Sequence, residues 1–177
     1  RAGQDFVAPQ EYSSDKFTEN FGRGHLVMPP DRGSKADEFL RQAGLDPENW
    51  YCCLHFRQPN YVYKSVSNCR DVEPEPYLQS IDYVIDELGG QVVLLGHPEL
   101  VTRKPRPGFV DLSRFPDNFK AQMYAVARSR FMYCSNAGAS SMAYALGVPL
   151  GLLDGADFWA GGPAAYLSHT LVCPDGA

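Results

Sequence analysis

The 177-residue sequence lacks the short motifs that identify several enzyme classes directly. It contains neither G-x-x-x-x-G-K-[ST] nor G-x-G-x-x-G, the glycine patterns of P-loop and dinucleotide-binding sites. A G-x-S-x-G nucleophile elbow, an H-E-x-x-H zinc helix and a D-x-D pair are also missing. These absences argue against a serine hydrolase and against a site built around a metal ion.

Clustered positive charge and long apolar runs are also missing. The formal net charge is −5 and the basic residues are scattered, which argues against a nucleic-acid partner. No apolar run approaches the roughly 18 residues that cross a bilayer, so we expect no transmembrane segment. The chain begins at Arg1 without an initiator methionine or a signal-peptide pattern, which predicts a piece of a longer protein. The expected location is cytoplasmic, with a peripheral position at the inner face of the plasma membrane as an alternative.

Cysteine is present without a pattern, because Cys52, Cys53, Cys69, Cys134 and Cys173 are odd in number and irregular in spacing. No C-x-x-C pair or Cys/His cluster offers zinc ligands. We interpret the cysteines as reduced and mostly buried in a cytosolic protein. Cys52 and Cys53 fall in a predicted strand and should point to opposite faces. Cys69 lies in a polar loop and is the candidate for a reactive thiol.

The sequence does contain a regular alternation of strand-like and helix-like segments. Its length suits one domain with a proper core. Residues 1–33 have little periodicity and are expected to be an irregular lead-in or an interdomain linker remnant, followed by one domain at 34–177. Strands are predicted at 50–56, 91–96, 108–113, 130–134, 148–153 and 169–173. With helices between them, they predict an α/β fold with a doubly wound, Rossmann-like parallel sheet.

The predicted helices have recognisable ends and faces. Ser34 offers an N-cap for a short helix that Gly44 ends. An apolar stripe at helical spacing occupies 77–88 and stops at a Gly-Gly pair. A further helix spans 139–147, and another begins near residue 118 with its own apolar stripe. The members of that last stripe are Phe119, Met123, Val126 and Ala127.

Candidate site residues follow from the rule that such sheets bind ligands beyond the carboxyl ends of their strands. His55 and Arg57 end the first strand on one face, so both can reach the same ligand. The planar guanidinium of Arg57 suits a pair of diphosphate oxygens. Two alternatives stay open, namely His55 as a satisfied core residue and Arg57 as a surface ion pair with a loop carboxylate.

The polar stretch after this strand is long for a loop within a compact domain, and such loops are often functional. Within it, Arg70 and Asp71 form either an internal ion pair that holds the loop shut or a contact with a phosphate or sugar. Gly96 follows the second strand and is expected at the same edge of the sheet.

Residues 134–141 read CSNAGASS and connect a strand to a helix. Backbone N–H groups at a helix N-terminus attract phosphate, and small residues let an anion approach. The candidate phosphate-facing residues are Ser135, Asn136, Ala137, Gly138, Ser140 and Ser141. The alternative is that a serine or asparagine merely caps the helix while Gly138 supplies a turn with positive φ.

These segments, in this order, resemble the C-terminal half of a bacterial glycosyltransferase family whose members occur with surface-polysaccharide biosynthesis genes. The resemblance covers roughly residues 50–153 and rests on YCCLHFRQPNY, NCRDVEPEPYLQS, ELGGQVVLLG and CSNAGASSMAYALGVP. The last segment is also similar to the corresponding turn of heptosyltransferase-like enzymes. It departs from them at Ala137, where small hydroxyl residues are commoner.

The resemblance implies the C-terminal, nucleotide-sugar-binding lobe of a GT-B fold. His55 and Arg57 match a His-x-Arg pair and would be catalytic, whereas Arg70, Asp71 and Gly96 would bind the substrate with the turn. Enzymes of this architecture hold the donor diphosphate with arginine and helix dipoles, so neither a metal nor another cofactor is expected. Expected partners are a nucleotide sugar, a glycan or lipid-linked acceptor, and an N-terminal lobe of the same parent protein.

Three functions follow as expectations. The leading one is a metal-independent glycosyltransferase, represented by its donor-binding lobe, that transfers a sugar to a glycan or related acceptor in surface-polysaccharide biosynthesis. The second is a non-catalytic nucleotide- or glycan-binding domain of a larger synthase. The third is a sugar epimerase of the same two-lobed fold, which would need acid and base carboxylates, and Asp154 and Asp157 are the candidates nearest the rim.

Overall fold

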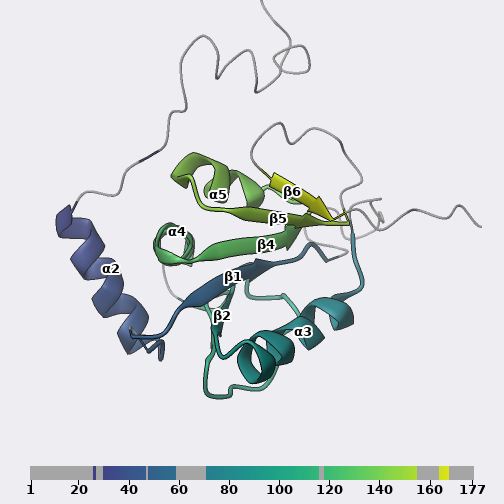
Figure 1. Cartoon of the computed structure of the whole chain (residues 1–177), viewed down its shortest axis with the longest axis horizontal. Coiled ribbons are helices and arrows are strands. Elements are labelled where there is room, and N and C mark those ends of the chain that lie inside the picture. Colours follow the sequence, from purple (N-terminus) through teal and green to yellow (C-terminus); the bar gives the residue numbers. More distant parts are fainter. Residues whose placement is uncertain are drawn as a thin grey trace, which may run out of the picture.

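A six-stranded sheet forms the centre of the computed structural model (Figure 1). The strand order is β3-β2-β1-β4-β5-β6, and every neighbouring pair runs parallel. The strands are β1 (Tyr51–His55), β2 (Gln91–Leu94), β3 (Phe109–Asp111), β4 (Phe131–Ser135), β5 (Leu150–Leu153) and β6 (Ala164–Leu167). The structure describes residues 26, 30–46, 48–58, 71–115, 118–154 and 164–167. The predicted α/β fold with a doubly wound parallel sheet is confirmed.

Helices cover both faces of the sheet, as near-continuous apolar strands require. They are α2 (Pro30–Gln42), α3 (Pro74–Asp82) with its π-helical continuation η1 (Tyr83–Glu87), α4 (Asn118–Arg128) and α5 (Ser140–Leu146). Cys53 points into a core formed with α2, α4 and α5, whereas Cys52 points into a core formed with α3 and η1. These two cysteines therefore lie on opposite faces, as predicted from the two-residue period of a strand.

The helix ends predicted at glycines are confirmed, whereas the predicted start of the first helix is wrong. Gly44, with φ 103°, follows the end of α2, and Gly89, with φ 67°, follows η1. The N-cap predicted at Ser34 is wrong, because α2 already begins at Pro30. Proline suits a first helical position, since its φ is fixed near the helical value and its missing N–H has no partner there.

The structure has an edge strand that the sequence did not predict. β6 spans Ala164–Leu167 and pairs with β5 at the edge of the sheet. The sequence there, AAYL, has no run of β-branched residues that would indicate a strand. The segment predicted as a strand at 169–173 lies outside the described residues, as do Cys69 and Cys173.

The apolar stripe predicted for α4 is buried or half-buried in the later part of the helix but not in its first turn. Ala125 and Val126 are fully buried against the sheet, but the Phe119 side chain is 69% exposed. The connection from β3 to β4 places the start of α4 at the carboxyl ends of the strands. Phe119 therefore lies beyond the core, at the edge of the sheet where ligands of such folds bind.

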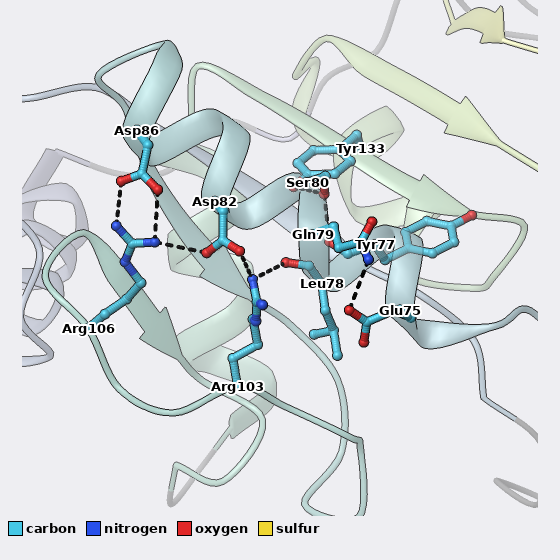
Figure 2. Close-up of polar contacts among 10 residues, drawn as sticks. All are labelled: Glu75, Tyr77, Leu78, Gln79, Ser80, Asp82, Asp86, Arg103, Arg106 and Tyr133. Atoms are coloured by element: carbon cyan, nitrogen blue, oxygen red, sulfur yellow. Dashed lines mark hydrogen bonds and ion pairs between the residues drawn. The ribbon is translucent and has the colours of Figure 1, made fainter.

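Two arginines anchor the connection from β2 to β3 onto α3 and η1 (Figure 2). Arg103 pairs with Asp82 and also donates to the Leu78 carbonyl oxygen at 2.9 Å. Arg106 reaches Asp82 at 2.8 Å and holds both carboxylate oxygens of Asp86. The Arg103 guanidinium, followed by that of Arg106, lowers the pKa of Asp82. The segment that leaves β2 is thus held on the α3 face of the sheet.

Gly90 is the position at which we expect a glycine substitution to destabilise the fold. A Cβ atom there would lie 2.4 Å from the Trp50 ring. Gly90→Ala should lower the free energy of unfolding by about 1–3 kcal/mol, because the rigid ring must move. Gly138→Ala is the control, since nothing lies within 4 Å of its Cβ position, and it should change stability by about 0.5 kcal/mol or less. Urea denaturation measures both, and equal effects would contradict the steric explanation.

Candidate functional site

A cleft of about 460 Å³ opens at the carboxyl ends of β1, β2 and β4. The sheet order reverses its direction between β1 and β4, so the cleft lies at the topological switch point where open α/β sheets bind ligands. Its lining residues are His55, Phe56, Arg57, Gln58, Gly96, His97, Pro98, Phe119, Gln122, Ala137, Gly138, Ala139 and Met142. The structure therefore brings together five of the predicted site residues, namely His55, Arg57, Gly96, Ala137 and Gly138.

Arg57 is held in the cleft by both its backbone and its side chain. Its N–H donates to the Ser135 hydroxyl oxygen at 2.8 Å, which ties the end of β1 to the end of β4. Its Nε donates to Asp71 Oδ1 at 2.9 Å, and its carbonyl oxygen accepts from the Val72 N–H at 3.1 Å. The ion pair with a loop carboxylate, one of the two alternatives for Arg57, is present. Because Asp71 engages the Nε edge, it orients the guanidinium at the cleft wall.

Asp71 and Ser135 support Arg57 instead of lining the cleft. The Asp71 side chain is 6% exposed, and Ser135 is fully buried. Ser135 was predicted to face a phosphate, but its hydroxyl is directed to the Arg57 N–H instead. Arg70, predicted beside Asp71, lies outside the described residues.

His55 carries a polar atom that nothing in the described structure satisfies. Its Nδ1 is buried and has no hydrogen-bond partner among the described residues. Burial, followed in size by the neighbouring His97 and Arg57, lowers the pKa of His55 to about 4. The imidazole is therefore neutral at pH 7 and can exchange a hydrogen bond with a ligand without carrying charge. The alternative of a satisfied core histidine does not fit this atom.

The CSNAGASS turn places Ala137 and Gly138 at the cleft but lacks the predicted helix cap and the predicted positive φ. Ala139 precedes α5 with helical φ and ψ and no side-chain cap, so neither a serine nor an asparagine caps this helix. Gly138 does not have the predicted positive φ, since it is absent from the positive-φ glycines of the described chain. The Ser140 hydroxyl donates to the Ala137 carbonyl oxygen at 2.8 Å. Ser141 is exposed, and Asn136, Ser140 and Ser141 are not among the lining residues of the cleft.

Gly96 contributes to the cleft through its conformation. Its φ is 151°, and a Cβ atom would lie 2.6 Å from Leu100 Cδ2. Its N–H donates to Gln122 Oε1 at 3.1 Å, and its carbonyl oxygen accepts from Gln122 Nε2 at 2.6 Å. Gln122 was not predicted, because a glutamine in an amphipathic helix gives no sign in the sequence of being buried.

Three further lining residues were not among the candidate site residues predicted from the sequence. Phe119 contributes an exposed ring and Met142 a flexible apolar side chain. The His97 ring accepts a hydrogen bond at Nδ1 from the Glu99 N–H at 3.2 Å, which fixes its orientation in the turn after β2. Arg57 is the one permanently charged side chain among the described lining residues.

Other features of the described chain bear on cofactors and partners. Within the described residues, His, Cys, Asp and Glu side chains do not gather in threes as a metal ion would need. No described helix is both long and apolar enough to cross a bilayer. Cys52, Cys53 and Cys134 are buried free thiols, and burial raises the pKa of Cys52 and Cys134 to about 12. These three cysteines therefore behave as the small apolar residues that the sequence predicted.

A comparison with protein-family models finds no match, and none is found among curated proteins. The fold is similar to a solved structure described as a glycosyl transferase family 9 protein from Veillonella parvula DSM 2008, with a TM-score of 0.58 and 17% sequence identity. The similarity covers 83% of this chain and 43% of that one, so this chain spans less than half the length of that protein. The likeness shows a shared Rossmann-like fold of the GT-B type.

We predict that His55 makes stability depend on pH. Its pKa is about 4 in the folded chain and about 6.5 when unfolded, so the unfolded chain binds more protons between these values. The stability from a neutral His55 is complete above about pH 6.5 and is lost as pH falls toward 4, by about 1.4 kcal/mol per pH unit. His55→Gln should flatten this slope in urea denaturation series. An NMR titration that places the wild-type His55 pKa near 6.5 would refute the prediction.

Proposed function

We propose that this chain is the nucleotide-sugar-binding unit of a metal-independent glycosyltransferase that acts in surface-polysaccharide assembly. The observation that carries the proposal is the cleft at the switch point, where Arg57 and a neutral His55 meet in a fold shared with a glycosyl transferase family 9 structure. A nucleoside diphosphate is dianionic or more and carries paired oxygens. The fork of Arg57 matches that geometry and charge.

Each wall of the cleft offers a different contact to such a donor. Arg57, oriented by Asp71, would hold the diphosphate, while Ala137 and Gly138 leave room for phosphate oxygens to approach the backbone. The unsatisfied Nδ1 of His55 would exchange a hydrogen bond with the phosphate or the sugar. Phe119 presents an exposed ring at the same cleft, and aromatic rings stack on flat bases.

The reaction breaks the bond between the anomeric carbon of the sugar and an oxygen of the nucleoside diphosphate. Negative charge grows on the departing diphosphate, and a guanidinium already aimed at it stabilises that charge in the transition state. An acceptor hydroxyl forms the new bond to the anomeric carbon and loses its proton to a general base. The described lining residues include no carboxylate. A second lobe of the parent protein would therefore supply the general base and the acceptor site.

A non-catalytic nucleotide- or glycan-binding unit of a larger synthase is the second candidate, because the described lining residues offer binding groups and no carboxylate base. The epimerase alternative has less support. Asp154 accepts a hydrogen bond from the Tyr77 hydroxyl at 2.7 Å and is not a lining residue, and Asp157 lies outside the described chain. Transfer of labelled sugar by the full-length parent protein would separate the enzyme from the binding unit.

We expect one nucleotide family to stabilise the chain in a thermal-shift panel of UDP, GDP, ADP, TDP and CMP. A ligand present at about 100 times its Kd adds about 2.7 kcal/mol to the free energy of unfolding, which raises Tm measurably. Inorganic phosphate is the control for non-specific anion binding and should give a smaller shift. If no nucleotide raises Tm beyond phosphate, the proposed donor site is wrong.

Arg57→Ala should weaken binding of the nucleotide identified in that panel at least about tenfold, or about 1.4 kcal/mol, because a charge-assisted pair is lost. Arg128→Ala is a matched control, since Arg128 is also ion-paired, with Asp37 at 2.8 Å, but lies away from the cleft. Calorimetry should show near-wild-type affinity for the control. Unchanged affinity in Arg57→Ala would exclude Arg57 from the diphosphate site.

A further inference from the structure

Two buried glutamines in this chain make the same pair of hydrogen bonds at opposite ends of the sheet. Gln91 is 4% exposed and Gln122 is 7% exposed. At the amino end of β2, Gln91 Oε1 accepts from the Asp46 N–H at 2.8 Å, and Nε2 donates to the carbonyl oxygens of Asp46 at 2.9 Å and Asn49 at 3.2 Å. Gln122 binds both backbone groups of Gly96 in the same way at the cleft. Gln91 therefore binds a loop away from the cleft, whereas Gln122 binds a residue that lines it.

The bonding of Gln122 requires a primary amide. Gly96 presents one N–H donor and one carbonyl acceptor to the same side-chain end, and a carboxamide offers one acceptor and donors side by side. A leucine of similar size would leave both half-buried backbone groups of Gly96 without these partners. A glutamate would keep an acceptor for the N–H but lose the donor to the carbonyl oxygen.

Gln122 joins two walls of the cleft that are far apart in the sequence. On one side it fixes Gly96, and the next residue is His97, whose carbonyl oxygen accepts from the Leu100 N–H at 2.9 Å. On the other side it belongs to α4, where Phe119 lies one turn earlier on the same face of the helix. Phe119, His97 and Gln122 all line the cleft. The Gln122 amide therefore links the turn that carries His97 to the helix that carries Phe119.

We propose that Gln122 is a positioning residue for the ligand of this cleft. It holds the turn after β2 against α4, so that His97 and Phe119 face the ligand at a fixed spacing. The identity of the ligand rests on the proposed function, whereas the coupling between Gln122, Gly96 and His97 does not.

The test compares Gln122→Leu with Gln91→Leu, because both remove a side-chain amide that binds the N–H and the carbonyl oxygen of one residue, and only Gln122 borders the cleft. Gln91→Leu also removes the bond to Asn49, so it is the stricter control for a general loss of stability. Both variants should lower Tm. Gln122→Leu should also weaken binding of whichever nucleotide of the panel the wild type binds, by about tenfold, while Gln91→Leu stays within about twofold. Gln122→Glu serves as a second variant if the leucine variant does not fold, and it should also bind more weakly than the wild type.

NMR supplies a readout that does not depend on a ligand. The Gly96 amide and the His97 ring resonances should shift in Gln122→Leu or Gln122→Glu and stay near their wild-type positions in Gln91→Leu. Unchanged His97 resonances in the Gln122 variants would overturn the positioning role, as would equal loss of affinity in both leucine variants. If the wild type binds no nucleotide, the proposed function fails, and the His97 resonances still decide whether Gln122 sets the turn.

Discussion

The central strand β1 is the constraint on which the cleft depends, because it is paired along both edges and buried on both faces. Its end cannot shift without disturbing β2 and β4 together. The Ser135 hydroxyl oxygen accepts a hydrogen bond from the Arg57 N–H, so the link between β1 and β4 continues beyond the last residue of β1. The charged group of the cleft is therefore positioned by the packed interior of the domain, and its side chain is oriented by Asp71.

Burial on both faces also explains how much of the fold could be predicted from the sequence. Strands such as β1 and β2 read as continuous apolar runs, and Gly44 and Gly89 mark helix ends through a backbone conformation that other residues rarely adopt. The edge strand β6 lacks such a run and was missed. Phe119 was misplaced because helical periodicity shows which side of a helix is apolar and not how far the helix extends past the sheet.

The residues of the site were harder to predict than their location. The switch point follows from the strand order, but the direction of a side chain at a strand end depends on partners that are distant in sequence. Ser135 is directed inward to a residue 78 positions away, and Gln122 binds a glycine 26 positions away. The turn before α5 has the expected small residues, yet the helix has only 7 residues and no side-chain cap. Permanent positive charge at the described cleft comes from Arg57.

The long polar stretch after β1 has its two ends joined through Arg57, which contacts Asp71 and Val72. Arg57 bonds to the Val72 N–H through its carbonyl oxygen and to Asp71 through its side chain, so the two ends of that stretch are already closed. With the ends fixed, doubling the length between them costs only about 0.6 kcal/mol of closure entropy. A change of length between these ends should therefore cost little stability as long as the two contacts of Arg57 are kept.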